Sequence, residues 1–152
     1  MAAYTITRSI EVDAEPTTCH ALVNDFHEWT AWSPWEDADP HLERTYSGPD
    51  SGVGARYAWS GNRKAGRGSM EIVESTPEQI RVRLVFEKPW KAENPVEFSF
   101  VPSATGTRVT WTMTGENRGL AAAFAKVVNM DKLLGKDFDR GLARLKAVAE
   151  ER

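Results

Sequence analysis

The sequence predicts an α+β domain in which a curved, seven-stranded antiparallel sheet wraps around one long C-terminal helix. Three observations predict this fold. Apolar and polar residues alternate over 42–115, apolar residues recur at a helical period after residue 119, and the gaps between the predicted strands are too short for a crossover helix. Because 152 residues suffice for one domain with a sizeable core, we expect residues 1–152 to form a single domain.

The N-terminal segment predicts one strand followed by two short helices. Apolar and polar residues alternate over 4–12, as they do in a strand with one buried face. Acidic residues precede Pro16, and proline is tolerated at the first position of a helix, so we expect a helix over 16–25. A second short helix is expected over 27–35 and should stop before Pro34, because the residue before a proline avoids the α region.

Six further strands are expected in the middle of the chain, paired in order as an antiparallel meander. Clusters of Gly, Pro, Asn, Asp and Ser separate them at distances typical of hairpins. The strands are expected at 42–47, 54–60, 67–75, 79–87, 95–101 and 107–115. Alternation within the strands gives the sheet one apolar and one polar face. In this register the side chains that point away from the core include those of Arg56, Arg81, Arg83 and Glu97.

The C-terminal segment predicts a long amphipathic helix. One helix over 119–150 would be roughly 48 Å long, so we expect a break near 129–131. Gly135 and Gly141 lie inside the second part, where each costs up to about 1 kcal/mol relative to alanine. We therefore expect a steric reason for both glycines: close approach of the sheet, or room for something between helix and sheet.

A single helix cannot cover a sheet of seven strands, since a helix is only about 10 Å across. The sheet is expected to curl around the helix, and the two short helices are expected to close part of the opening. Where the curl is incomplete, an apolar space remains between sheet and helix. That space is the natural ligand site.

The side chains on the inner face are the candidate ligand contacts, although each of them could simply fill the core. They are Tyr57, Trp59, Met70, Leu84, Phe86, Phe98, Trp111 and Met113 on the strands, and Met130, Leu134 and Phe138 on the last helix. Arg56 and Glu71 are the candidate polar groups, because both flank aromatic inner positions on adjacent strands. The alternative for these two is an exposed cross-strand ion pair.

Four of the six tryptophans lie outside the predicted strands. Trp29, Trp32 and Trp35 fall on the second short helix, and we expect them to anchor the short helices on the edge of the sheet. The alternative is that one of these rings forms a lid over the mouth of the cavity. Trp90 follows Pro89 in a loop.

Composition and motifs argue against several classes of protein. A formal net charge of −3 argues against a nucleic-acid or anionic-membrane partner. No apolar run reaches the roughly 18 residues of a membrane span, and the N-terminus lacks the pattern of a signal peptide, so we expect no membrane insertion and a cytoplasmic location. The spacing of His, Cys and carboxylate residues supplies no metal ligands around the single Cys19, and we expect no metal and no cofactor.

Four segments of the chain resemble one protein superfamily. They read Ala-Glu-Pro-Thr-Thr-Cys-His at 14–20, Asp-Phe-His-Glu-Trp-Thr-Ala-Trp-Ser-Pro-Trp at 25–35, Gly-Val-Gly-Ala-Arg-Tyr-Ala-Trp at 52–59 and Gly-Leu-Ala-Arg-Leu-Lys at 141–146. Together with the order of the elements, they are similar to the SRPBCC superfamily, most of all to its polyketide cyclase/dehydrase-like group, which is related to START lipid-transfer domains and Bet v 1-type plant proteins. The resemblance covers essentially the whole chain. It implies a helix-grip fold with a deep hydrophobic cavity between the sheet and the last helix.

Three functions remain open, because members of this superfamily include aromatase/cyclases, lipid and hormone carriers and co-chaperone-like proteins. The first is binding of a small hydrophobic or aromatic molecule, lipid-like or polyketide-like, in the cavity. The second is a cyclase or dehydratase that uses an inward Arg, Tyr or Glu as its acid-base group. The third is a protein-interaction domain or homodimer, in which Trp32, Trp35 and Trp90 form an exposed patch.

Overall fold

Seven antiparallel strands form one sheet in the order β1-β7-β6-β5-β4-β3-β2. Strands β2 to β7 are the predicted meander, and β1 pairs with β7 at one edge of the sheet. The computed structural model describes residues 2–35, 39, 41–62, 66–88, 91–117 and 130–152. The strands are β1 (Ala2–Val12), β2 (Glu43–Ser47), β3 (Arg56–Ser60), β4 (Arg67–Thr76), β5 (Gln79–Lys88), β6 (Ala92–Pro102) and β7 (Thr107–Asn117).

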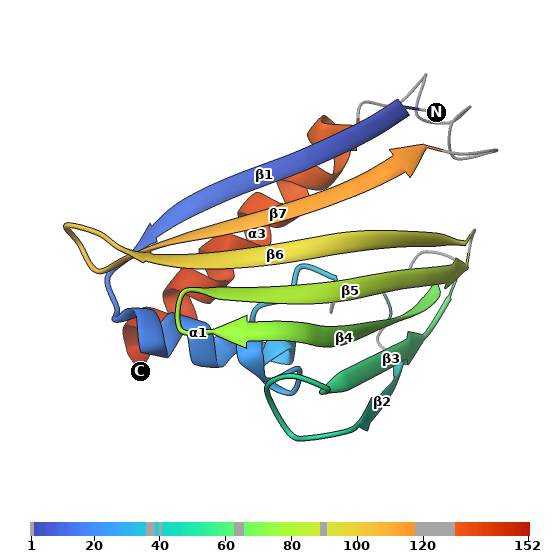
Figure 1. Cartoon of the computed structure of the whole chain (residues 1–152), viewed down its shortest axis with the longest axis horizontal. Helices are drawn as coiled ribbons and strands as arrows, with labels where there is room; N and C mark the ends of the chain where they lie inside the picture. Colours follow the sequence, from blue (N-terminus) through green and yellow to red (C-terminus); the bar gives the residue numbers. More distant parts are fainter. Residues whose placement is uncertain (1, 36–38, 40, 63–65, 89–90, 118–129) are drawn as a thin grey trace.

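Within the described residues, three helical elements accompany the sheet. They are α1 (Pro16–Asn24), the 3-10 helix η1 (Glu28–Ala31) and α3 (Met130–Glu151). Figure 1 shows α3 running behind the sheet, with α1 close to its C-terminal end. The long helix packs mainly on β1. This arrangement is the expected helix-grip α+β fold. The break expected near 129–131 falls where α3 begins, and residues 118–129 lie outside the described residues.

Two strands differ from the prediction in ways that change which side chains face the core. The strand expected at 95–101 begins at Ala92, and Pro95 lies inside it with its ring pointing outward. A register shift in β4 leaves Val73 as a bulge and turns Ser75 to the same face as its partner Ile80. Strict alternation would have turned Ser75 outward, because a bulge reverses the facing of every residue that follows it.

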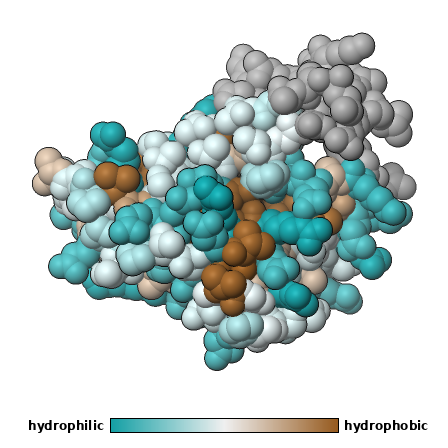
Figure 2. Space-filling view, viewed as in Figure 1, coloured by the Kyte–Doolittle hydropathy of each residue, from teal (hydrophilic) through white to brown (hydrophobic). Residues whose placement is uncertain are grey.

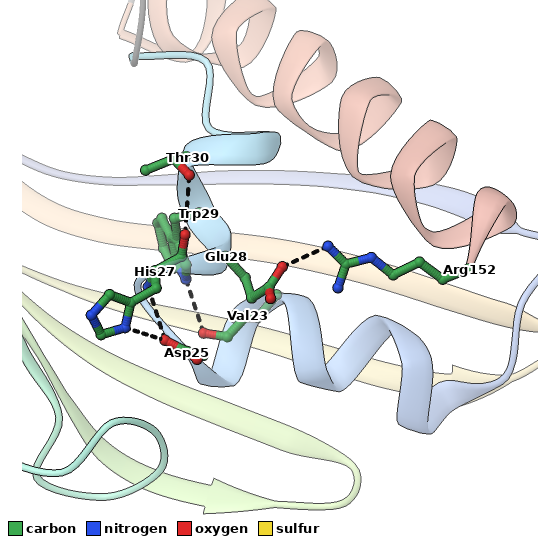
Figure 3. A network of polar contacts seen from close by, with 7 residues as sticks. All are labelled: Val23, Asp25, His27, Glu28, Trp29, Thr30 and Arg152. Atoms are coloured by element: carbon green, nitrogen blue, oxygen red, sulfur yellow. Dashed lines mark hydrogen bonds and ion pairs between the residues drawn. The ribbon is translucent and has the colours of Figure 1, made fainter.

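The second short helix, expected over 27–35, is the single turn of η1. Two of the three tryptophans in this segment bond to the end of α1. The indole N–H of Trp29 donates to the carbonyl of Val23 at 2.9 Å, as Figure 3 shows, and that of Trp32 donates to the carbonyl of Leu22 at 2.9 Å. The last carbonyls of a helix have no partner within it, so these indoles complete the C-terminal end of α1.

Aromatic rings fill the space where α1, η1 and α3 meet the sheet. Trp111 lies parallel to Phe138 with ring centroids 4.1 Å apart, and it stacks on Phe98 with centroids 4.9 Å apart. Trp29 and Trp32 contact the same two strands edge-on. All five side chains are buried, so Trp29 and Trp32 do anchor their segment on the sheet, but on the inner strands β6 and β7 and not on the edge that was predicted. We call these five rings the aromatic core.

Both glycines of α3 have a close neighbour, as predicted. A Cβ atom on Gly135 would lie 2.1 Å from Nη2 of Arg8 on β1. A Cβ atom on Gly141 would lie 2.8 Å from Cδ of Pro34 and 3.1 Å from Cζ3 of Trp111. The glycines therefore let the helix approach β1 and the segment after η1.

The outer face of the sheet carries pairs of Arg and Glu side chains on neighbouring strands. Arg83 pairs with Glu93 at 2.6 Å, and Arg81 lies 3.6 Å from Glu74. This confirms the outward register predicted for the arginines. Figure 2, which looks onto this face, shows a mostly hydrophilic surface with a narrow hydrophobic strip near its middle. Exposed pairs of this kind contribute little to stability, roughly 0–1 kcal/mol each.

Candidate functional site

The side chains of the inner face, which is the face that α3 packs against, form rows across the strands, because neighbouring strands are paired residue by residue. The Trp111 row contains Arg8, Trp111, Phe98, Ile80 and Ser75. The Trp59 row contains Arg44, Trp59, Gly68, Phe86 and Ala92. Between them lies the Tyr4 row, made of Tyr4, Gly115, Asn94, Leu84, Met70, Tyr57 and Tyr46.

Burial differs from row to row. In the Trp111 row the rings of Trp111 and Phe98 are buried in the aromatic core. In the Trp59 row the rings of Trp59 and Phe86 are only partly buried, and they meet edge-on with centroids 5.8 Å apart. Solvent therefore reaches apolar side chains of the inner face at the end of the sheet where Trp59 lies. We call this region the Trp59 end.

The candidate ligand contacts predicted from the sequence fall into three groups according to how deeply their side chains are buried. Those inside the aromatic core are Phe98, Trp111 and Phe138. Those buried elsewhere on the inner face are Tyr57, Leu84 and Met113. Those that are partly exposed are Trp59, Met70, Phe86 and Leu134. The side chain of Met130 lies outside the described residues.

Arg56 and Glu71 lie on the outer face, away from α3. Their side chains form a cross-strand ion pair with Nε and Oε1 3.6 Å apart, and they are 64% and 31% exposed. They line a depression of about 340 Å³ together with the outward-facing Thr45, Ser47, Ala58, Ser69, Arg83 and Val85, and the inner-face residues Tyr57 and Met70 border it as well. The sequence predicted this outward direction from the alternation in β3 and β4.

Three polar side chains of the inner face are not among the candidate site residues predicted from the sequence, although the alternation over 4–12 puts the first of them on the side of Ile6: Tyr4, Arg8 and Asn94. Asn94 is only 3% exposed, and it was missed because the strand was expected to begin at Pro95. A proline is usually found at the first residue or the edge of a strand. Tyr4 and Arg8 have the same parity as the buried Ile6, so alternation alone could have identified them.

Asn94 and Tyr4 are hydrogen-bonded to each other across β7. The side-chain amide of Asn94 donates to the hydroxyl of Tyr4 at 2.9 Å and to the carbonyl of Thr114 at 3.1 Å. The carbonyl can only accept, so it fixes which end of the Asn94 amide is the NH₂ group. Burial raises the pKa of Tyr4 above its ordinary value, against the opposing effect of the Asn94 hydrogen bond, so the phenol is protonated at neutral pH.

Arg8 lies between β1 and α3. Its Nε atom is 3.5 Å from a carboxylate oxygen of Asp139, and its side chain is 27% exposed. The guanidinium also donates to the carbonyl of Thr7 at 2.9 Å. Arg8 is therefore a cation at the rim of the inner face, next to Trp111 in the same row.

His20 is the titratable group that α1 presents to the sheet. Its ring meets Phe100 edge-on with centroids 5.4 Å apart, and its Nε2 atom lies 3.3 Å from the hydroxyl of Ser75, which the bulge turns inward. The same hydroxyl donates to Oδ1 of Asn24 at 2.7 Å. Burial lowers the pKa of His20, because the charged ring would lose its hydration.

The predicted patch of three tryptophans is wrong for Trp32, which is fully buried in the aromatic core. Trp35 is 37% exposed, and Trp90 lies outside the described residues. The indole of Trp32 is turned inward by its bond to the end of α1.

Neither a cluster of metal ligands nor a helix able to span a membrane occurs within the described residues. No three or more His, Cys, Asp or Glu side chains of that part of the chain are grouped so that they could hold a metal ion. None of the helices found there is both long and apolar enough to cross a membrane.

Comparison with known families identifies the chain. Residues 3–150 match the family described as "Polyketide cyclase / dehydrase and lipid transport". The chain belongs to this family. This result agrees with the resemblance to the SRPBCC superfamily that the four sequence segments indicated. No match is found among curated proteins.

Solved structures share the fold at low sequence identity. Protein CV1439 from Chromobacterium violaceum is 15% identical, with a TM-score of 0.68 over 96% of this chain and 97% of that one. A norcoclaurine synthase from Thalictrum, in complex with a transition-state analogue, is 11% identical, with a TM-score of 0.68 over 99% of this chain and 96% of that one. DynU16, from the dynemicin biosynthetic locus, is 16% identical, with a TM-score of 0.66 over 96% of this chain and 47% of that one.

Proposed function

We propose that this protein binds a small hydrophobic or aromatic molecule, lipid-like or polyketide-like, on the inner face of its sheet, beyond the part that α3 covers. The observation that carries the proposal is the Trp59 end. Its inner-face side chains, Trp59, Met70 and Phe86, are apolar and yet reached by solvent. The family, whose description joins polyketide cyclases with lipid transport, supports the same class of ligand. We also propose a cytoplasmic location.

The chemistry of this surface favours a flat or hydrocarbon ligand. Each 100 Å² of apolar surface that a ligand covers contributes about 2.5 kcal/mol before the entropic cost of binding. Trp59 stacks near Tyr57, with centroids 6.2 Å apart, and meets Phe86 edge-on, so two ring directions are available to an aromatic ligand.

A binding screen with matched tryptophan variants tests the proposal. Native mass spectrometry and tryptophan fluorescence would follow binding of flavonoids, fatty acids, sterols and aromatic polyketides. Trp59→Leu should weaken a bound compound about tenfold, since it removes roughly 50 Å² of apolar contact at about 25 cal/mol per Å². Trp35→Leu, which changes a partly exposed indole beside the aromatic core, is the control and should leave affinity unchanged. The proposal would be overturned if Trp59→Leu bound the compound as tightly as the wild-type protein, or if no compound bound saturably.

A cyclase or dehydratase activity is the second candidate, and the observation that favours it is the protonated phenol of Tyr4 on the inner face. A phenol can donate a proton to a carbonyl oxygen during aldol closure or to a leaving hydroxyl during dehydration. The test is incubation with a linear poly-β-ketone and detection of loss of water by mass spectrometry. Unchanged substrate, or turnover that Tyr4→Phe leaves intact, would rule out this role for Tyr4.

A further inference from the structure

Gly115 makes the contact between Tyr4 and Asn94 possible. The three residues lie side by side on β1, β7 and β6, with the glycine in the middle. A Cβ atom on Gly115 would lie 2.2 Å from Nδ2 of Asn94 and 2.6 Å from the hydroxyl oxygen of Tyr4. The two side chains therefore meet above the glycine, on the face of the sheet that looks toward α3. Any side chain at position 115 would separate them.

This pair has hydrogen-bonding capacity left over. Both hydrogens of the Asn94 amide are used, one by Tyr4 and one by the carbonyl of Thr114. Since the Tyr4 oxygen accepts from Asn94, its own proton points elsewhere. Within the described part of the chain, no hydrogen bond uses that proton or reaches Oδ1 of Asn94. Asn94 is only 3% exposed, but its Oδ1 is not a fully buried atom, so a ligand or water can reach it.

The pair adjoins the proposed ligand surface. Leu84 follows Asn94 in the Tyr4 row, and Met70 follows Leu84. The Trp59 row lies directly beside it, with Phe86 two residues beyond Leu84 on β5. A ligand lying along Met70 and Phe86 would thus have the Tyr4 hydroxyl and the Asn94 carbonyl at one of its ends. These are the only two polar groups that the described residues of the Tyr4 row present between Leu84 and β1.

We propose that Tyr4 and Asn94 recognise the hydroxyl group of an otherwise apolar ligand. The Tyr4 hydroxyl donates to the ligand oxygen, and Oδ1 of Asn94 accepts the ligand's own proton. The preferred class is a phenol or an alcohol on an aromatic or lipid skeleton. An ether or a ketone satisfies Tyr4 alone, and a hydrocarbon leaves both groups unpaired, which is costly at a buried site. This inference rests on the proposed function, because it places the ligand on the same face.

Three naphthalene probes separate these cases by calorimetric titration. 2-Naphthol can satisfy both groups, 2-methoxynaphthalene can satisfy Tyr4 only, and naphthalene can satisfy neither. The wild-type protein should bind 2-naphthol about tenfold more tightly than naphthalene, with the ether between them, which corresponds to about 1.4 kcal/mol. Tyr4→Phe should reduce this preference to about twofold or less. The control is Tyr46→Phe, which also removes a tyrosine hydroxyl but at the opposite end of the Tyr4 row, and it should keep the preference for 2-naphthol.

A second variant keeps the test decisive if Tyr4→Phe does not fold. Gly115→Ala drives the pair apart and should also remove the preference for 2-naphthol, while circular dichroism checks that the sheet is intact. Equal binding of the three probes to the wild-type protein would overturn this inference and leave the proposed function standing. A preference that survives both Tyr4→Phe and Gly115→Ala would overturn it as well. Failure of all three probes to bind saturably would overturn this inference, and the ligand screen described above would decide the proposed function separately.

Discussion

The two glycines of α3 predict opposite changes in stability when each is replaced by alanine. Helix propensity alone should raise the free energy of unfolding by about 1 kcal/mol in both variants, because glycine is a poorer helix former than alanine by that amount. Gly135→Ala brings its new methyl group against the guanidinium of Arg8, whose nearest atom would be 2.1 Å away. That group ends a flexible side chain, and its ion pair with Asp139 is partly exposed, so moving it costs about 0.5 kcal/mol or less. We expect Gly135→Ala to stabilise the protein by about 0.5 kcal/mol.

Gly141→Ala meets rigid neighbours instead. Its methyl group would lie 2.8 Å from Cδ and 3.2 Å from Cγ of the Pro34 ring, and 3.1 Å from Cζ3 of the buried Trp111. Overpacking of this kind costs about 1–3 kcal/mol, which outweighs the gain in helix propensity. We expect a net loss of about 1 kcal/mol.

Urea denaturation of the two variants beside the wild-type protein measures the difference. With unchanged m-values, the midpoint should rise for Gly135→Ala and fall for Gly141→Ala, because the midpoint is the free energy of unfolding divided by m. The comparison removes helix propensity from the result, since both variants gain it equally. Equal shifts in the same direction would show that the contacts of Gly141 with Pro34 and Trp111 do not restrict the helix, and would refute the reasoning.

Two further predictions concern the aromatic core and the interface of α1. Phe138→Ala should lower the free energy of unfolding by about 3–5 kcal/mol, because it removes a fully buried ring that lies parallel to Trp111; a loss below 1 kcal/mol in urea denaturation would contradict this packing. Burial lowers the pKa of His20 below its ordinary value of 6.5. At a pH between the two pKa values, His20 is therefore protonated in the unfolded chain and neutral in the folded one. The free energy of unfolding should therefore fall as pH drops from 7.5 to 5.5, and His20→Gln should flatten this dependence; an equally steep profile in the variant would argue against the buried position.

Alternation in the sequence was enough to predict the sheet and its two faces. It could not predict burial along one face, because that depends on where the helices lie. Trp59 and Trp111 both occupy inner positions, but only Trp111 lies beneath η1 and α3. The rings that the sequence grouped as one candidate site are therefore a solid core at one end and an accessible surface at the other.

The remaining differences have local causes that a strand pattern does not contain. Pro95 lies inside β6, whereas the sequence predicts a strand that begins at this proline and so places Asn94 in the preceding loop. The bulge at Val73 turned Ser75 toward α1, where it contacts His20. Arg8 was passed over because charged residues are seldom expected on an inner face, although its position between two apolar residues of the same parity marked it.

The bonds from Trp29 and Trp32 to the end of α1 couple two parts of the molecule that could otherwise open separately. Both indoles hold carbonyls of α1 and, at the same time, pack against Phe98. Unwinding the end of this helix would thus expose the rings on the sheet, and the two should form one cooperative unit in hydrogen exchange. The short edge strand β2 pairs with β3 in the sheet, and it meets the segment between α1 and η1 through the stacking of Tyr46 on His27, with centroids 4.0 Å apart, rather than through a bond to a helix carbonyl. Transient opening at that edge would give a ligand a route to the Trp59 end while the opposite half of the fold keeps its shape.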